Sequence, residues 1–316
     1  MPPCDPASVQ RITILGAGTI GSGWAAHFLA CGKKVTVTDP APGSADRVSA
    51  FIESTWPALV QLGTAKVDAP PTHRFVEDPA EAVQDAQFVQ ESAPENLEIK
   101  RVLYERVEAT MPENTVVSTS TSGILISDLQ EGRLHPERFV VGHPFNPPYL
   151  VPLVEVVGGR HTSPELVDWT VNFYRLHQKH PIKLNKEVPG HLANRLQMAL
   201  WREAVHAAIE GIASMEDIDA AVTEALGIRW AVVGPHLTVH LAGGPGGIHH
   251  QLEHLGPGIQ AWFDDLGTPN LTPEVKDHLV NGMNEALAGR EFESLVEQRD
   301  RELVDLLRER RQSRGK

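Results

Sequence analysis

The sequence predicts an α/β fold, in which a doubly wound and largely parallel sheet is followed by an all-α C-terminal domain. Short β-type runs alternate with helical periods from residue 11 to residue 184, and such alternation is typical of parallel sheets. Beyond residue 190 only helical periods follow. The chain has 316 residues, more than one ordinary core accommodates. We therefore expect two domains, 1–187 and 188–316.

Composition narrows the classes of protein that this chain can belong to. Apolar residues make up 41% of the chain, which suits globular packing, and the net charge of −13 argues against a nucleic-acid partner. The N-terminal residues lack the pattern of a signal peptide, and no stretch is long and apolar enough to span a membrane. With only two cysteines, we expect no structural disulfide and a cytoplasmic protein.

The first strand and helix enclose a glycine-rich turn. The β-type run 11–15 leads into Gly16-Ala-Gly18-Thr-Ile-Gly21, a helical pattern follows, and a second β-type run ends at Asp39. In this context GxGxxG predicts a Rossmann-type dinucleotide site with the pyrophosphate at the helix N-terminus. Asp39 would accept hydrogen bonds from the ribose hydroxyls and repel a 2′-phosphate. The predicted cofactor is therefore NAD.

The later strands and helices bring further polar residues to one edge of the predicted sheet. Glu95 follows the β-type run 86–91, and Ser122 closes a run of hydroxyl side chains after the run 115–118. Because ligands bind at the carboxyl ends of parallel strands, these residues should lie near Gly18. The predicted cofactor-binding residues are Gly16, Gly18, Thr19, Ile20, Gly21, Asp39, Glu95 and Ser122.

His143 and Glu155 are the candidate catalytic pair. His143 ends an apolar run before Pro144, and Glu155 lies inside the apolar run 153–157. A buried carboxylate needs a partner, and a histidine held by a carboxylate is a common general base. By themselves the two residues fit equally well a core histidine in a structural hydrogen bond and a glutamate that faces solvent. The convergence of Gly18, Glu95, Ser122 and His143 at strand ends favours the catalytic interpretation.

The C-terminal half offers fewer candidates. Asn194 lies in the first turn of a helix that follows Pro189–Gly190, where it either faces solvent or reaches into the cleft beside the domain boundary. The pairs His236/His240 and His250/His254 have the i,i+4 spacing of zinc ligands. No cysteine accompanies them and no HExxH motif occurs, so we expect no metal.

Taken together, these motifs resemble those of the 3-hydroxyacyl-CoA dehydrogenase family over nearly the whole chain. The resemblance rests on the glycine turn, Ser122, the segment His143-Pro-Phe-Asn-Pro147, Glu155, and Pro189-Gly-x-x-x-Asn194-Arg. It implies an NAD domain, a helical domain that forms a homodimer, and oxidation of a 3-hydroxyl group. It also implies that His143 is the base, that Glu155 orients it, and that Ser122 and Asn194 bind the substrate.

Two departures from the CoA-dependent members bear on the substrate. Residues 44–74 supply few positive charges for CoA phosphates, and residues 227–244 differ from the acyl-CoA pattern. The sequence of these residues is similar to that of the branch of the family that oxidises L-carnitine, and more distantly to that of the L-gulonate branch. A quaternary ammonium is recognised by aromatic faces, for which Trp230 and Phe145 are candidates. The alternatives are L-gulonate, 3-hydroxybutyryl-CoA, or a non-catalytic NAD-binding or structural protein.

Overall fold

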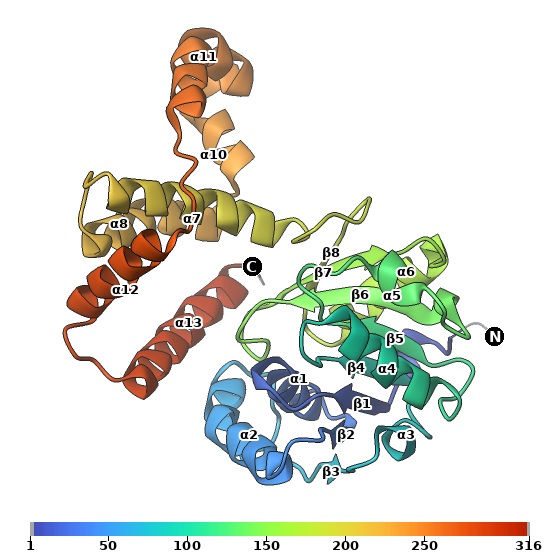
Figure 1. The fold of residues 1–316 in the computed structure, drawn as a ribbon. Helices are drawn as coiled ribbons and strands as arrows, with labels where there is room; N and C mark the ends of the chain where they lie inside the picture. Colours follow the sequence, from blue (N-terminus) through green and yellow to red (C-terminus); the bar gives the residue numbers. More distant parts are fainter. Residues whose placement is uncertain (1–2, 315–316) are drawn as a thin grey trace. The chain divides into compact units, whose positions relative to one another are not determined.

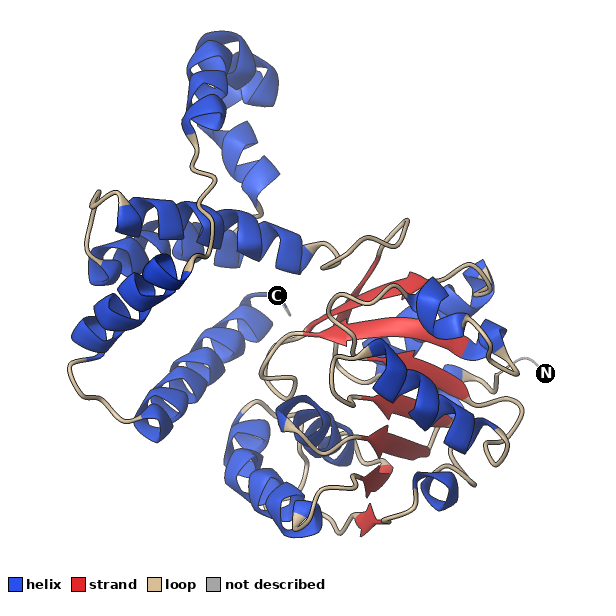
Figure 2. Cartoon of the chain, viewed as in Figure 1, coloured by secondary structure: helices blue, strands red, loops and turns tan. Residues whose placement is uncertain are grey.

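The computed structural model describes residues 3–314 (Figure 1, Figure 2). The described chain divides into two compact units. The first joins the residues up to Asn194 with those from Leu295 onward, and the second is Arg195–Ser294. The sequence predicted a single boundary after residue 187. The structure instead groups the last helix with the first unit, because that helix packs against the sheet domain through side chains such as buried Val304.

The first unit is built on an eight-stranded sheet with the order β3-β2-β1-β4-β5-β6-β7-β8. The strands are β1 (Arg11–Leu15), β2 (Lys34–Thr38), β3 (Arg74–Phe75), β4 (Phe88–Glu91), β5 (Val116–Thr119), β6 (Phe139–Pro144), β7 (Leu153–Gly158) and β8 (His180–Lys183). All neighbours are parallel except β6 and β7. The expected doubly wound sheet is confirmed, with one antiparallel pair.

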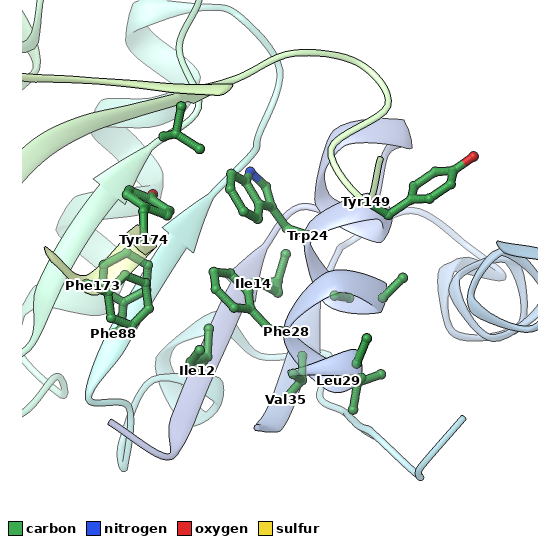
Figure 3. Close-up of a cluster of buried hydrophobic side chains, with 14 of the residues drawn as sticks. Ile12, Ile14, Trp24, Phe28, Leu29, Val35, Phe88, Tyr149, Phe173 and Tyr174 are labelled. Atoms are coloured by element: carbon green, nitrogen blue, oxygen red, sulfur yellow. The ribbon is translucent and has the colours of Figure 1, made fainter. Parts of the chain in front are cut away.

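Helices cover both faces of this sheet. They are α1 (Thr19–Ala30), α2 (Ser44–Gln61), α3 (Pro79–Ala82), α4 (Leu97–Glu108), α5 (Ile126–Gln130) and α6 (Pro164–Leu176). The unit also contains most of α13 (Phe292–Arg314) and short 3-10 turns at Pro6–Ser8 and Pro136–Arg138. One core joins the sheet to α1, α2 and α6, and the other joins it to α4 and α5. The first core contains stacked aromatic rings (Figure 3): Trp24 on Phe28 at 5.1 Å and Phe88 on Phe173 at 3.9 Å between ring centroids.

The antiparallel pair β6–β7 determines which residues face each other. A parallel connection needs a crossover of about a dozen residues or more, and the segment 145–152 is too short for one. The chain therefore folds back on itself, and the register pairs His143 directly with Glu155. Directly opposite residues on neighbouring antiparallel strands project to the same face of the sheet.

The second unit is helical, as the sequence predicted. It contains α7 (Ala193–Ile209), α8 (Met215–Ala221), a π-helical segment (Val222–Gly227), α9 (Ile228–Val232), α10 (Pro235–Ala242), α11 (Gly247–Asp265) and α12 (Pro273–Leu287), with a 3-10 turn at Gly244–Gly246. Many of its large apolar side chains are exposed, among them Trp201, Trp262 and Phe263. Within residues 3–314, no helix has the length and apolar character needed to cross a bilayer.

Candidate active site

The glycine turn between β1 and α1 has the geometry of a phosphate-binding loop. Gly16 has φ +100°, and a Cβ atom there would lie 2.5 Å from the carbonyl oxygen of Ser92, so only glycine fits. At Gly18, the N-cap of α1, an added Cβ would meet no atom within 4 Å. Thr19 and Ile20 form the first turn of α1. This open helix N-terminus suits a pyrophosphate.

Asp39 lies beside this turn at the carboxyl end of β2. Its Oδ2 atom accepts a hydrogen bond from the backbone N–H of Ala17 at 2.8 Å, and its Oδ1 accepts from Ala41 N and Ser44 Oγ. The carboxylate borders a surface hollow formed by residues 39–45 together with Phe75 and nearby polar residues. A fixed negative charge at this edge suits ribose hydroxyls and disfavours a 2′-phosphate, so the chain's own residues fit NAD.

Glu95 holds the turn that carries Ser122. Its Oε1 atom accepts hydrogen bonds from Thr121 Oγ1 at 2.6 Å and from the backbone N–H groups of Ser122 and Gly123 at 2.9 Å each. Burial opposes ionisation, but the Thr121 bond, the positive charge of Lys100 and the two backbone donors lower the pKa of Glu95. Glu95 therefore stays charged and orders the segment after β5.

A cluster of buried charged and polar side chains lies next to Glu95. Lys100, on α4, donates to Glu91 Oε1 at 2.6 Å, and both side chains are almost fully inaccessible. The other oxygen of Glu91 accepts from Tyr104 Oη and Thr119 Oγ1, each at 2.6 Å. The charged residues of α4 have the spacing of a solvent-exposed helix face, so the sequence did not predict the ion pair between Lys100 and Glu91. The partner of Lys100 belongs to a strand that only the tertiary fold brings close.

His143 is hydrogen-bonded on both ring nitrogens. Nδ1 lies 2.9 Å from Glu155 Oε2, and Nε2 lies 3.2 Å from Ser122 Oγ. A carboxylate only accepts, so Nδ1 carries a proton, and in the neutral imidazole the Ser122 hydroxyl donates to the Nε2 lone pair. His143 is 3% exposed. The contact between His143 and Glu155 that the sequence led us to expect is present.

Glu155 is completely buried, and every hydrogen bond it makes comes from a donor that favours the charged form. Its second oxygen, Oε1, accepts hydrogen bonds from the backbone N–H groups of Leu192 and Ala193 at 2.9 and 2.8 Å. Burial favours the protonated acid, but the bonds from His143, Ala193 and Leu192 outweigh it, and the pKa of Glu155 is lowered. The site thus combines a fixed negative charge with an imidazole whose Nε2, when unprotonated, can take a proton.

The remaining candidates differ in how closely the structure ties them to this pair. The Phe145 ring meets the His143 ring edge-on, with centroids 4.9 Å apart. Asn194 is half-buried at the end of the first unit, and its side chain makes no hydrogen bond within the described part of the chain. Trp230 lies in the helical unit with 39% of its surface exposed. Among residues 3–314, no group of three or more His, Cys, Asp or Glu is arranged to hold a metal ion.

His191 was not among the predicted site residues, yet its ring centroid lies 5.0 Å from that of His143. The sequence pattern did not predict this proximity, because the approach depends on an unusual backbone angle. His191 has φ +49°, a left-handed conformation that non-glycine residues rarely adopt. A histidine directly after a glycine at a domain boundary was the available signal.

Two family models cover most of the chain. The NAD-binding domain of 3-hydroxyacyl-CoA dehydrogenase matches residues 11–188, and the C-terminal domain of 3-hydroxyacyl-CoA dehydrogenase matches residues 190–291. An L-carnitine dehydrogenase from Streptomyces griseus is 51% identical over 97% of this chain and 91% of its own length. Another, from Oceanobacillus iheyensis, is 42% identical over 95% of this chain and 97% of its own length.

Solved structures of related enzymes have the same architecture. The NAD⁺-dependent dismutase 5-formyl-3-hydroxy-2-methylpyridine 4-carboxylic acid 5-dehydrogenase has a TM-score of 0.82 and 30% identity, covering 95% of this chain and 98% of its own. The 3-hydroxybutyryl-CoA dehydrogenase of Escherichia coli has a TM-score of 0.62 and 30% identity, covering 68% of this chain and 46% of its own.

Proposed function

The chain belongs to the 3-hydroxyacyl-CoA dehydrogenase family and is an NAD-dependent oxidoreductase, and we propose that it oxidises the 3-hydroxyl group of L-carnitine to give 3-dehydrocarnitine. The observation that carries this proposal is the full-length similarity to L-carnitine dehydrogenases, at 51% and 48% identity in the Streptomyces griseus and Streptomyces coelicolor proteins. The His143–Glu155 pair supplies the base that such an oxidation needs.

The proton of the substrate hydroxyl moves to His143 in this proposal. Nε2 accepts it because Glu155 keeps the other ring proton on Nδ1, and Ser122 Oγ, 3.2 Å from Nε2, donates to the same hydroxyl oxygen. Glu155 then stabilises the imidazolium that results. When bound, NAD⁺ is the hydride acceptor, and the residues that would hold it are Gly16, Gly18, Thr19, Ile20, Gly21, Asp39, Glu95 and Ser122. A positioned base contributes about 10²–10⁴-fold to such reactions.

The trimethylammonium group of carnitine has no hydrogen-bond donor and calls for aromatic faces. We assign this contact to Phe145, beside His143, and we assign Asn194 to the substrate hydroxyl. Phe145→Leu should raise KM for carnitine and leave KM for 3-hydroxybutyrate, which lacks the ammonium group, nearly unchanged. Equal increases for both substrates would contradict the assignment.

A CoA ester is the less favoured substrate because the basic side chains of residues 44–74 are engaged within the protein. Arg47 donates to Ser44 Oγ and Pro42 O, Lys66 donates to Gly63 O, and Arg74 pairs with Glu81. Initial rates of NADH formation with L-carnitine, L-gulonate, 3-hydroxybutyrate and its CoA ester would test the proposal. Carnitine should give the highest kcat/KM. A preference for another substrate would overturn the carnitine assignment, and no NADH with any of them would favour a non-catalytic role.

We further propose that the protein is a cytoplasmic homodimer in which a second copy covers the helical unit. Among the described residues of this unit, the buried apolar side chains are Val205 and Ala208. Trp262 and Phe263 are 67% and 64% exposed. An apolar surface of this kind is typical of an interface between subunits. Sedimentation equilibrium should give a dimer mass, and a monomer at micromolar concentration would refute the proposal.

A further inference from the structure

His191 is a buried histidine beside the catalytic pair to which the proposed function assigns no role. It is 2% exposed and lies between Gly190 and the first turn of α7. Its ring is inclined to that of His143, with the centroids 5.0 Å apart. Because it approaches the reacting imidazole so closely, its own protonation state bears on the chemistry.

The hydrogen bonds of His191 determine where its proton lies. Nε2 is 2.9 Å from the carbonyl oxygen of Thr121, which can only accept, so Nε2 carries the proton. Nδ1 is buried and has no partner among the described residues, so a proton on Nδ1 would be an unsatisfied donor. Burial accordingly lowers the pKa of His191, and the positive charge that His143 gains on protonation acts in the same direction, against the Thr121 bond and the charges of Glu155 and Glu95. His191 is therefore neutral and adds no positive charge beside His143.

The backbone of His191 contributes a second feature. At φ +49° the residue occupies the left-handed region, which is unfavourable for a side chain with a Cβ unless the surroundings stabilise it. This turn precedes the N–H groups of Leu192 and Ala193, which both donate to Glu155 Oε1. The strained residue therefore lies directly before the two donors that hold the catalytic carboxylate.

We propose that His191 is a positioning residue that couples the two supports of His143. Its side chain anchors the left-handed turn to Thr121, the neighbour of Ser122, and the turn presents two backbone donors to Glu155. Glu155 is thereby kept in line with Nδ1 of His143 while Ser122 is kept near Nε2. This inference rests on the proposed function, because it assumes that His143 is the base.

Three substitutions separate this role from simple packing. His191→Gln retains a donor that reaches Thr121, His191→Leu has a similar size and no donor, and His191→Asn tolerates the left-handed backbone but is too short to reach. His177 provides a matched control, because it is also buried and bonded to a backbone carbonyl, that of Phe173. His177 packs on Phe28 and Phe173, so His177→Leu perturbs the core without touching the pair.

The decisive measurement is the titration of the His143 imidazole, followed by NMR on the full-length protein without substrate. With Leu or Asn at position 191 the midpoint should move to lower pH, because a less ordered Glu155 stabilises the imidazolium less. The Gln variant and the His177→Leu control should titrate like the wild type. In steady-state assays kcat should fall by about 3- to 10-fold with Leu, the effect of one lost hydrogen bond, while KM for NAD⁺ stays constant.

A second comparison asks whether the effect passes through Glu155. In a Glu155→Gln background, His191→Leu should change neither the titration midpoint nor kcat any further, because the carboxylate that it positions is gone. An undiminished effect in that background would overturn the proposal. So would a wild-type titration of His143 in a folded Leu or Asn variant, or a Gln variant as impaired as Leu.

The failure of the proposed function would be recognised separately. If the wild-type protein does not oxidise carnitine but the titrations behave as described, the substrate assignment fails and the role of His191 stands. If carnitine is oxidised and the titrations do not move, the reverse holds. Should the Leu variant not fold, as judged by circular dichroism, the Asn and Gln variants decide the question.

Discussion

Glu155→Gln is the substitution for which the structure predicts the largest loss from the smallest change in shape. The carboxylate accepts on both oxygens, from His143 Nδ1 at 2.9 Å and from Leu192 N and Ala193 N at 2.9 and 2.8 Å. A glutamine has one oxygen and one NH₂ group. The backbone N–H groups of Leu192 and Ala193 would compete with His143 Nδ1–H for that oxygen. Because the two backbone donors outnumber the single imidazole donor, the oxygen should stay with them and the NH₂ group should face His143 Nδ1.

This arrangement reverses the tautomer of His143. Nδ1 must then accept, so the proton moves to Nε2, which can no longer take the substrate proton. Losing a hydrogen bond to a charged group costs about 1.5–3 kcal/mol, which corresponds to roughly 10- to 150-fold in rate at about 1.4 kcal/mol per tenfold. Because the imidazole would also be in the wrong tautomer to act as a base, we expect kcat to fall by about 10²–10⁴-fold, the usual contribution of a general base.

The assay is NADH absorbance at saturating NAD⁺ and carnitine over a range of pH. The acidic limb of the rate profile should move to lower pH, because the imidazolium has lost its counter-charge. Glu155→Asp, which keeps the charge, should lose less, and NAD⁺ affinity should be unchanged in both variants. A folded Glu155→Gln enzyme with kcat within about threefold of wild type, and an unmoved profile, would refute the reasoning.

Three further outcomes are expected. His143→Ala should lower kcat by about 10²–10⁴-fold while NAD⁺ affinity, measured by fluorescence titration, stays within about twofold; a matching loss of affinity would count against a catalytic role. Asp39→Ser should raise KM for NAD⁺ by about tenfold, from the loss of charge-assisted bonds, and lower it for NADP⁺; an unchanged preference would contradict the ribose assignment. Burial lowers the pKa of Lys179 from 10.5 to about 7, so between these values the unfolded chain binds a proton that the folded chain does not. The free energy of unfolding of the wild type, measured by urea denaturation relative to Lys179→Met, should therefore rise with pH in that window, by up to about 1.4 kcal/mol per pH unit. A difference between the two proteins that stays constant with pH would disprove this.

Local patterns were sufficient for the fold class and for the cofactor. The glycine turn is encoded by neighbours in sequence, since a strand, a tight turn and a helix N-terminus all lie within residues 11–31. Gly16 illustrates why: its φ of +100° is a local backbone conformation that glycine adopts readily. Alternating β-type and helical periods likewise predicted the sheet, because these periods reflect which face of each element is buried.

The residues around the catalytic pair depended on contacts that periodicity does not encode. Lys100 has the spacing of a surface charge and is nonetheless buried on Glu91. His191 lies at an ordinary-looking helix start, and its approach to His143 depends on a left-handed backbone angle that sequence rarely reveals. Likewise, the packing of α13 on the first unit involves residues far apart in the chain.

Residue types and local periods establish the chemistry that is available: an NAD-binding turn, one imidazole and one carboxylate in apolar surroundings, and a helical second unit. How these groups meet is established by the three-dimensional fold. The antiparallel register of β6 and β7 sets His143 opposite Glu155, and the turn before α7 brings two N–H groups to the same carboxylate. Register and turn geometry follow from how the elements pack in three dimensions, whereas residue type and local period are properties of the chain alone.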